Sequence, residues 1–146
     1  MSQSTNKSPG RLGCDNLFGD VIYRYTRAQA IEDGVLINAT EMAKEAGFNW
    51  PVALTAATWL DCVAWSDADN ECQAYQDQSG RLWDVLFMAS YAIRAAKNSD
   101  QQLLFDLQRI ARDGCSTESQ GLTLKLILGP GDDGEPVITI MLLEED

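Results

Sequence analysis

The sequence predicts an α+β domain in which helices pack on a C-terminal three-stranded antiparallel meander. Apolar residues recur every three or four positions over 82–97, a period typical of an amphipathic helix. Residues alternate in character over 103–109 and 122–128, and a further apolar run covers 137–143. Between the last two segments, the turn 129–135 is rich in Gly, Pro and Asp, which is typical of a hairpin.

For the N-terminal part of this domain, the sequence predicts short strands and helices. The β-branched and aromatic run 21–25 favours a strand. Thr26 is then placed to cap a helix over 27–33, which Gly34 ends. The apolar run 35–37 follows as a second short extended segment.

Two helices are expected next. Thr40 can cap a helix over 41–46, and Gly47 stands where a helix commonly ends. Pro51 suits the first position of a longer helix of about four turns. The apolar face of that helix would consist of Val52, Ala56, Trp59, Leu60 and Val63.

The segment 66–80 is polar and acidic, and we expect a loop there, with at most an irregular helix end. The helix over 82–97 follows. Its apolar stripe comprises Leu82, Val85, Leu86, Ala89 and Ile93, and Trp83, Phe87 and Tyr91 widen it. So broad a stripe predicts that this helix is largely buried.

Length and composition set limits on the domain. The chain has 146 residues, which suits one domain, and 45% of them are hydrophobic. We expect residues 1–14 to form a flexible leader and residues 15–146 a single domain. The leader lacks the apolar core of a signal peptide, and no apolar run is long enough for a membrane helix. These features predict a cytoplasmic protein.

The residue types present disfavour most catalytic and metal chemistry. The sequence contains no histidine, the residue on which triads and common zinc sites depend. Its four cysteines lack paired spacing, so we expect free thiols. A calcium loop starting at Asp67 fails because Cys72 and Gln78 replace its required Gly and Glu. We therefore expect no catalytic residue, no metal and no cofactor.

The net charge of −11 points to the sign of a partner's charge. It repels phosphate and anionic lipid, so direct binding of nucleic acid or membrane is disfavoured. Two acidic blocks are the candidate contacts for a basic protein partner: Asp67, Asp69 and Glu71 in the acidic segment, and Asp132, Asp133 and Glu135 at the hairpin tip. The alternative is that these carboxylates only solvate the surface.

The tryptophans divide into two groups. Trp59 and Trp83 lie on the predicted buried faces. Trp65 falls beside the acidic segment, where it would be either an aromatic anchor for a partner or a side chain buried under that segment.

A weaker pattern covers 22–36. A strand, a Thr-capped helix and a Gly-Val-Leu exit are similar to the opening of ADP-ribosyltransferase folds. The histidine that those folds often carry in the strand is missing, and no later glutamate can be assigned to catalysis. A small enzyme with such a corner is one alternative function.

Several longer blocks of the sequence carry a further resemblance: Asp15–Tyr23, Tyr25–Ala28, Ala30–Gly34, Pro51–Thr55, Asp61–Trp65, Gly80–Leu86 and Gly129–Ile138. Together they span residues 15–143 and resemble a family of small acidic proteins of unknown function from bacterial plasmids, integrative elements and phages. It implies a mobile genetic element as the setting, and it brings no catalytic residues.

The charge and the resemblance together favour a binding protein without enzymatic activity. Its acidic surface would dock on a basic, nucleic-acid-binding surface of a host defence protein, such as a nuclease, as anti-CRISPR and anti-restriction inhibitors do. The alternative is a maintenance or regulatory module of a mobile element that acts through other protein contacts.

Overall fold

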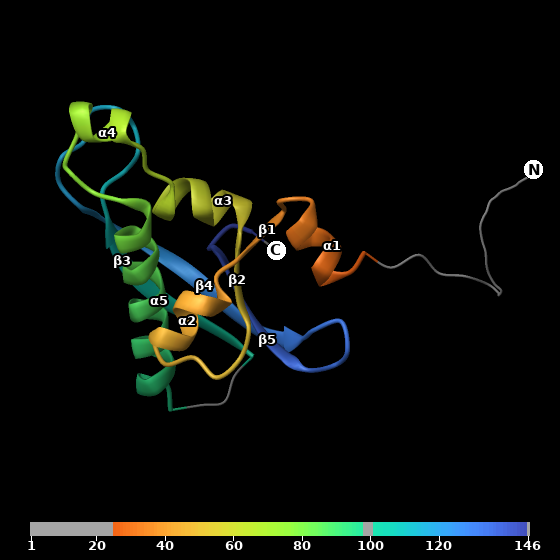
Figure 1. Ribbon diagram of the computed structural model, residues 1–146. Coiled ribbons are helices and arrows are strands. Elements are labelled where there is room, and N and C mark those ends of the chain that lie inside the picture. The colour runs from red at the N-terminus through yellow and green to blue at the C-terminus, as the bar shows by residue number, and fades with distance from the viewer. Residues whose placement is uncertain (1–24, 98–100, 146) are drawn as a thin grey trace, which may run out of the picture.

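The computed structural model describes residues 25–97 and 101–145 (Figure 1). The expected leader, residues 1–14, lies outside the described residues, and so does the expected strand 21–25 except for its last residue. That residue, Tyr25, lies outside any strand, half exposed, and its hydroxyl donates to the carboxylate of Asp33.

The described residues form an α+β fold around one five-stranded mixed sheet. Its strands are β1 (Leu36–Asn38), β2 (Val52–Thr55), β3 (Gln102–Arg109), β4 (Gln120–Pro130) and β5 (Pro136–Leu142). They lie in the order β1-β2-β5-β4-β3. The antiparallel meander β3-β4-β5 is confirmed. The expected three-stranded sheet is too small, because β5 also pairs in parallel with β2, which pairs with β1.

The first helix, α1 (Arg27–Glu32), follows the sequence prediction closely. Thr26 caps it with a complete capping box, in which Gln29 is the reciprocal partner. Gly34, at φ +80, follows its end. The guanidinium of Arg27 reaches across to β5, where it donates to the hydroxyl of Thr139 and the carbonyl of Ile138.

The second helix, α2 (Thr40–Glu45), starts one residue earlier than predicted. The capping position is Ala39, which makes no side-chain cap. Thr40 is the first helical residue, and its hydroxyl donates to Asn38 at 2.6 Å. Gly47 does end the helix, with φ +102, where a β-carbon would be strained.

The predicted four-turn helix from Pro51 is wrong. Residues Val52–Thr55 form β2, and only then come a short helical turn, α3 (Ala56–Thr58), and the π-helix η1 (Trp59–Val63). Strand β2 lies between two other strands, and Val52, Ala53 and Leu54 are at most 1% exposed. A strand buried on both faces is apolar throughout, so its spacing can imitate that of a helix.

The predicted acidic loop 66–80 is also wrong in part. It contains the helix α4 (Asp67–Cys72), and the long helix α5 (Gln78–Ala95) begins before position 80. Both starts carry capping side chains, Ser66 for α4 and Asp77 for α5. Each accepts a hydrogen bond from a backbone N–H in the first helical turn, which offsets the lack of a helical partner there.

The core lies between one face of the sheet and the helices α2, η1 and α5. Its fully buried centre includes Leu54, Val63, Leu86, Leu124 and Ile140. Trp59 packs partly buried against this core. Helix α5 is buried along one side only, however, because its three aromatic residues Trp83, Phe87 and Tyr91 are 37%, 45% and 58% exposed. The expectation of a largely buried helix, with Trp83 in the core, is therefore wrong.

Candidate functional site

The acidic helix α4 stands at one end of the molecule, beside the connection between β3 and β4 (Figure 1). Ser66 caps it: its hydroxyl accepts from the N–H of Asp69, and the Asp69 carboxylate accepts from the N–H of Ser66 at 2.8 Å. This capping box occupies one of the acidic side chains. The carboxylates of Asp67 and Glu71 are on exposed residues of the same short helix.

Asn70 fastens α4 to the body of the protein. Its side-chain oxygen accepts one hydrogen bond from the indole N–H of Trp65 at 2.8 Å and another from the N–H of Gln76 at 2.7 Å. Trp65 itself is only 7% exposed. Trp65 is therefore buried beneath the acidic helix, and it is not an exposed anchor for a partner.

Arg81, from the first turns of α5, lies below Trp65. It is 3% exposed, and its guanidinium carbon is 4.4 Å from the centre of the indole ring. Its N–H groups donate to the carbonyls of Val63 and Ile110 and to the side chain of Gln76. Desolvation lowers the pKa of this guanidinium from its ordinary value, yet Arg remains charged.

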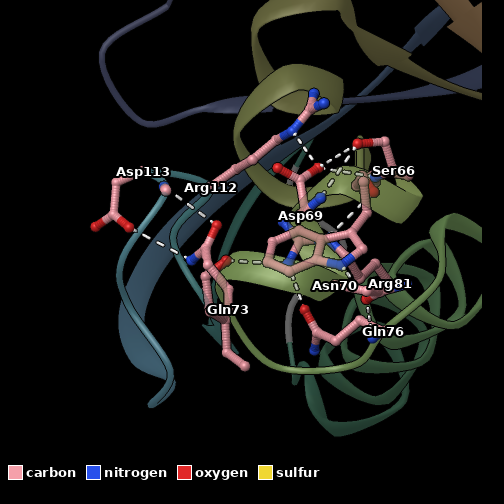
Figure 2. Close-up of polar contacts among 12 residues, drawn as sticks. Ser66, Asp69, Asn70, Gln73, Gln76, Arg81, Arg112 and Asp113 are labelled. Atoms are coloured by element: carbon pink, nitrogen blue, oxygen red, sulfur yellow. Dashed lines mark hydrogen bonds and ion pairs between the residues drawn. The ribbon is translucent and has the colours of Figure 1, made fainter.

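The connection after β3 folds over the same helix (Figure 2). The side-chain amide of Gln73 donates to the carbonyls of Ala111 and Ser116 at 2.8 and 2.6 Å, and its oxygen accepts from the N–H of Gly114. Arg112 forms an ion pair with Asp69 at 2.8 Å. The end of α4 and this connection are thus joined into one polar network.

Two carboxylates of the network are held ionised. Partial desolvation of Asp69 opposes ionisation, but hydrogen bonds from Ser66 and Arg112 outweigh it and keep the pKa below its usual range. The pKa of Asp113 is lowered by the hydroxyl and the N–H of Ser116 and by the N–H of Cys115. Both groups therefore stay negative well below neutral pH.

The hairpin block of carboxylates is used differently. Asp132 accepts from the N–H groups of Arg27 and Ala28 at 2.7 and 3.0 Å, at the start of α1. Glu135 accepts from the N–H of Asp133 within the turn itself. Asp132 also stands near the Arg27 guanidinium and opposes the lowering of its pKa by desolvation. Asp132 thus holds the hairpin against α1, while Glu135 braces the turn.

The structure does not bring the two predicted acidic blocks together. Helix α4 and the turn between β4 and β5 lie at opposite ends of the molecule in Figure 1. Of the predicted contact residues, Asp69, Asp132 and Glu135 take part in hydrogen bonds that shape the fold. Asp133 is exposed by itself at the hairpin tip, where its N–H donates to Glu135. Asp67 and Glu71 stand together on α4, so they carry the candidate site.

The surface next to α4 adds aromatic and acidic groups that the sequence did not single out. Tyr75 is 87% exposed, and a shallow pocket of about 370 Å³ lies between it and the start of α5. Asp77, Trp83 and Asp84 line that pocket. Burial raises the pKa of Asp84 from its ordinary value, although Arg81 partly offsets the effect.

Residues that hold the site together had little signal in the sequence. Gln73 and Asn70 belong to a segment read as a loop, and Arg81 precedes an apolar stripe. A single clue was present: Ser66 and Asp69 have the spacing of a capping box, which predicts a helix start.

The cysteine thiols and acidic side chains of the described residues were expected to form neither disulfides nor a metal site. Cys62, Cys72 and Cys115 are free thiols, as expected, and Cys14 lies outside the described residues. Burial, followed by the nearby Asp61, raises the pKa of Cys62 to about 12, so its thiol stays protonated at neutral pH. Over residues 25–97 and 101–145, no three acidic or cysteine side chains gather as a metal site. No helix in the same ranges has the length and apolar character to cross a membrane.

Fold and site together define an acidic α+β protein with a carboxylate-bearing helix at one end. Sequence comparison matches residues 15–146 to a family of unknown function, DUF6573, and the chain belongs to that family. This confirms the expected membership of a family of unknown function, and the mobile-element setting stays a prediction. Comparisons with curated proteins and with solved structures found no match.

Proposed function

We propose that this protein is a binding protein without enzymatic activity that docks helix α4 on the basic, nucleic-acid-binding surface of a partner protein. The most concrete version is an inhibitor of a host defence nuclease, of the anti-CRISPR or anti-restriction type. The observation that carries the proposal is the fixed placement of an exposed acidic helix: Asp67 and Glu71 are exposed on α4, which a partly buried polar network holds in place.

Rigidity is what makes these carboxylates useful for binding. Basic surfaces built for nucleic acid attract polyanions at long range and gain affinity by releasing counterions. An acidic group that is already held in place loses less conformational entropy on docking than one on a flexible loop. Asn70, Gln73 and Arg112 hold α4 in this way, so Asp67 and Glu71 meet a partner in a defined arrangement.

The neighbouring groups extend the same surface. Asp77 and Asp84 are exposed beside α4, and they line the same pocket as the exposed rings of Tyr75 and Trp83. Aromatic faces flanked by carboxylates suit Lys and Arg side chains, since both ion pairing and cation–π contact are available there. The proposal needs no cofactor and no direct contact with nucleic acid or membrane.

The experiment is a competition assay with purified restriction and CRISPR nucleases. Each nuclease is loaded with a labelled DNA duplex or guide–target complex, and the protein is added in excess at low and moderate salt. We expect release of the nucleic acid from at least one nuclease, with an effect that weakens as salt rises. The double variant Asp67→Lys/Glu71→Lys is expected to compete at least tenfold less well.

The matched control is Glu32→Lys/Glu41→Lys. It changes the net charge by the same amount, but it alters exposed residues of α1 and α2 away from α4. Equal competition by the two double variants would show that only overall charge matters. Binding that persists unchanged at high salt would instead favour the maintenance or regulatory module, and failure to displace nucleic acid from any nuclease would refute the inhibitor.

A further inference from the structure

A pocket lies between the loop that follows α2 and the last turns of α5. Its volume is about 230 Å³, and its apolar walls include Phe48, Trp50 and Ile93. Trp50 and Ile93 are 43% and 38% exposed, so a ligand can reach their side chains. Because an apolar cavity of about 150 Å³ holds benzene, this pocket has room for a ring with a small polar group attached.

A buried hydroxyl without a partner lies at this pocket. Ser90 lines the pocket and is 5% exposed, and within residues 25–97 and 101–145 its hydroxyl makes no hydrogen bond. Two other buried polar side chains, Thr58 and Arg81, are both hydrogen-bonded. A buried hydroxyl normally has a partner, and in a helix the preceding turn often supplies one. The unpartnered hydroxyl of Ser90 therefore indicates where a polar atom of a ligand would bind.

Arg94 adds a positive charge beside that hydroxyl. It follows Ser90 by four residues, so both lie on the same side of α5. A β-carbon at Gly47 would be 3.5 Å from Nη1 of Arg94 and 3.7 Å from Oγ of Ser90, so the two polar atoms border one small space. In the part of the chain that the structure describes, the Arg94 guanidinium forms no ion pair and no hydrogen bond. Its donors are therefore available to a ligand.

A carboxylate fits these donors best. A guanidinium can give a carboxylate two parallel hydrogen bonds, and a serine hydroxyl can donate one more. A doubly charged phosphate is less suitable, because the net charge of −11 repels a dianion more strongly than a monoanion. The apolar walls of the pocket suit a ring attached to that carboxylate.

We propose that this pocket binds a small aromatic monocarboxylic acid. The carboxylate of the acid accepts hydrogen bonds from Arg94 and Ser90, and its ring packs against Trp50 and Ile93. Helix α5, which has 18 residues and spans about 27 Å, begins near α4 and ends at this pocket (Figure 1). The site is therefore separate from the docking surface of α4, and the inference does not depend on the proposed function.

NMR spectra of the isotope-labelled full chain test the proposal, with phenylacetate and indoleacetate as probes and their neutral amides as controls. Each compound is titrated to about 20 mM, since so small a ligand is expected to bind with millimolar affinity. We expect saturable shifts of the Trp50 indole N–H and the Gly47 amide with at least one acid. That acid should bind at least tenfold more tightly than its amide, because the amide lacks the charge that Arg94 recognises.

Variants of the two donors test the assigned contacts. Arg94→Gln should weaken binding of the acid at least tenfold and leave binding of the amide unchanged, whereas Ser90→Ala should weaken binding of the acid several-fold. Lys44→Gln is the matched control, because it removes the same charge from an exposed residue of α2 that does not line the pocket. Its affinity for the acid should change less than twofold.

Circular dichroism checks that each variant keeps its fold. Four results would each overturn the proposal: shifts at Trp50 and Gly47 that do not saturate with either acid, equal affinity for acid and amide, equal losses in Arg94→Gln and Lys44→Gln, or no loss in Ser90→Ala.

Discussion

The guanidinium of Arg81 is buried under the acidic helix, where it donates hydrogen bonds to protein acceptors instead of water. It donates to the carbonyls of Val63 and Ile110 while its plane lies over Trp65. Removing it would leave both buried carbonyls without this donor, and a buried acceptor without a partner costs about 1–3 kcal/mol. The positive charge also faces the acidic end from below.

We therefore expect Arg81→Met to lower the free energy of unfolding by about 3 kcal/mol, since Met keeps much of the volume but none of the donors. Urea denaturation followed by circular dichroism measures this loss. Arg94→Met is the control: Arg94 belongs to the same helix but is exposed, so its change should stay within about 0.5 kcal/mol. Equal losses in both variants would contradict the role of Arg81.

Asp113 makes a prediction about pH. Its carboxylate accepts hydrogen bonds from Ser116 and Cys115, which lower its pKa below that of an unfolded chain, about 3.9. The stabilisation is therefore complete above pH of about 4 and is lost as the pH falls through the folded pKa. Carbon NMR titration of the Asp113 carboxyl should show a midpoint, and hence a pKa, below the usual Asp value of about 3.9.

Ser116→Ala provides the matched variant for that titration. It removes the largest cause of the shift while the backbone N–H donors remain, so the midpoint of Asp113 should move upward toward the ordinary value. A midpoint that does not respond to the substitution would show that the hydroxyl contributes nothing to holding this connection beside Gln73.

Among the elements, β2 gives the sharpest contrast between sequence and structure. A helix over this segment would bury Leu60 on its apolar face and turn Leu54 away from it. In the structure Leu54 is fully buried in the interior strand β2, whereas Leu60 is 62% exposed.

Leu54→Ala is accordingly expected to lower the free energy of unfolding by about 3 kcal/mol, because it leaves a cavity in the core. Leu60→Ala should cost no more than about 0.5 kcal/mol. Urea denaturation of the two variants side by side decides the matter. The reverse order of losses would support the helix.

Local signals explain which elements could be predicted. Thr26 and Gly34 bracket α1 with a cap and a left-handed glycine, and alternation with a glycine-rich turn marks β4 and β5. These signals act over a few residues. The pairing of β2 with β5 joins segments about 86 residues apart, and nothing local specifies it.

The candidate site could be predicted only by charge. Asp67 and Glu71 were identified because acidic residues cluster there, and they remain exposed. Asp69 and Asp132 looked equivalent to them in the sequence, yet each accepts backbone hydrogen bonds in the folded chain. Whether a carboxylate faces a partner or caps a helix depends on the tertiary neighbours, which the composition does not reveal.

At the scale of the whole molecule, the excess of negative charge opposes the compact state. The net charge is −11, and of the ion pairs between described residues the one from Lys44 to Glu41 joins two exposed side chains of α2. Folding brings like charges closer than they are in the unfolded chain, so their mutual repulsion lowers the stability of the folded state.

The salt dependence of stability shows whether this repulsion or the attraction within the ion pairs is larger. The Debye length falls from about 30 Å at 0.01 M to about 8 Å at 0.15 M, so salt screens repulsion between distant carboxylates strongly. It also weakens the pairs Arg109–Asp61 and Arg112–Asp69, but each such pair near the surface contributes no more than about 1 kcal/mol. Repulsion summed over eleven excess charges should dominate. Added salt should therefore stabilise the folded state by on the order of 1 kcal/mol, which raises the melting temperature by several degrees.

Differential scanning calorimetry at about 0.01 M and about 0.15 M NaCl measures that rise, because the Debye length falls from about 30 to about 8 Å between these concentrations. Glu32→Lys/Glu41→Lys reduces the net charge without touching the network under α4, so its melting temperature should depend less on salt than that of the natural chain. A melting temperature that falls with salt in the natural chain would mean that the pairs made by Arg109 and Arg112 outweigh the repulsion.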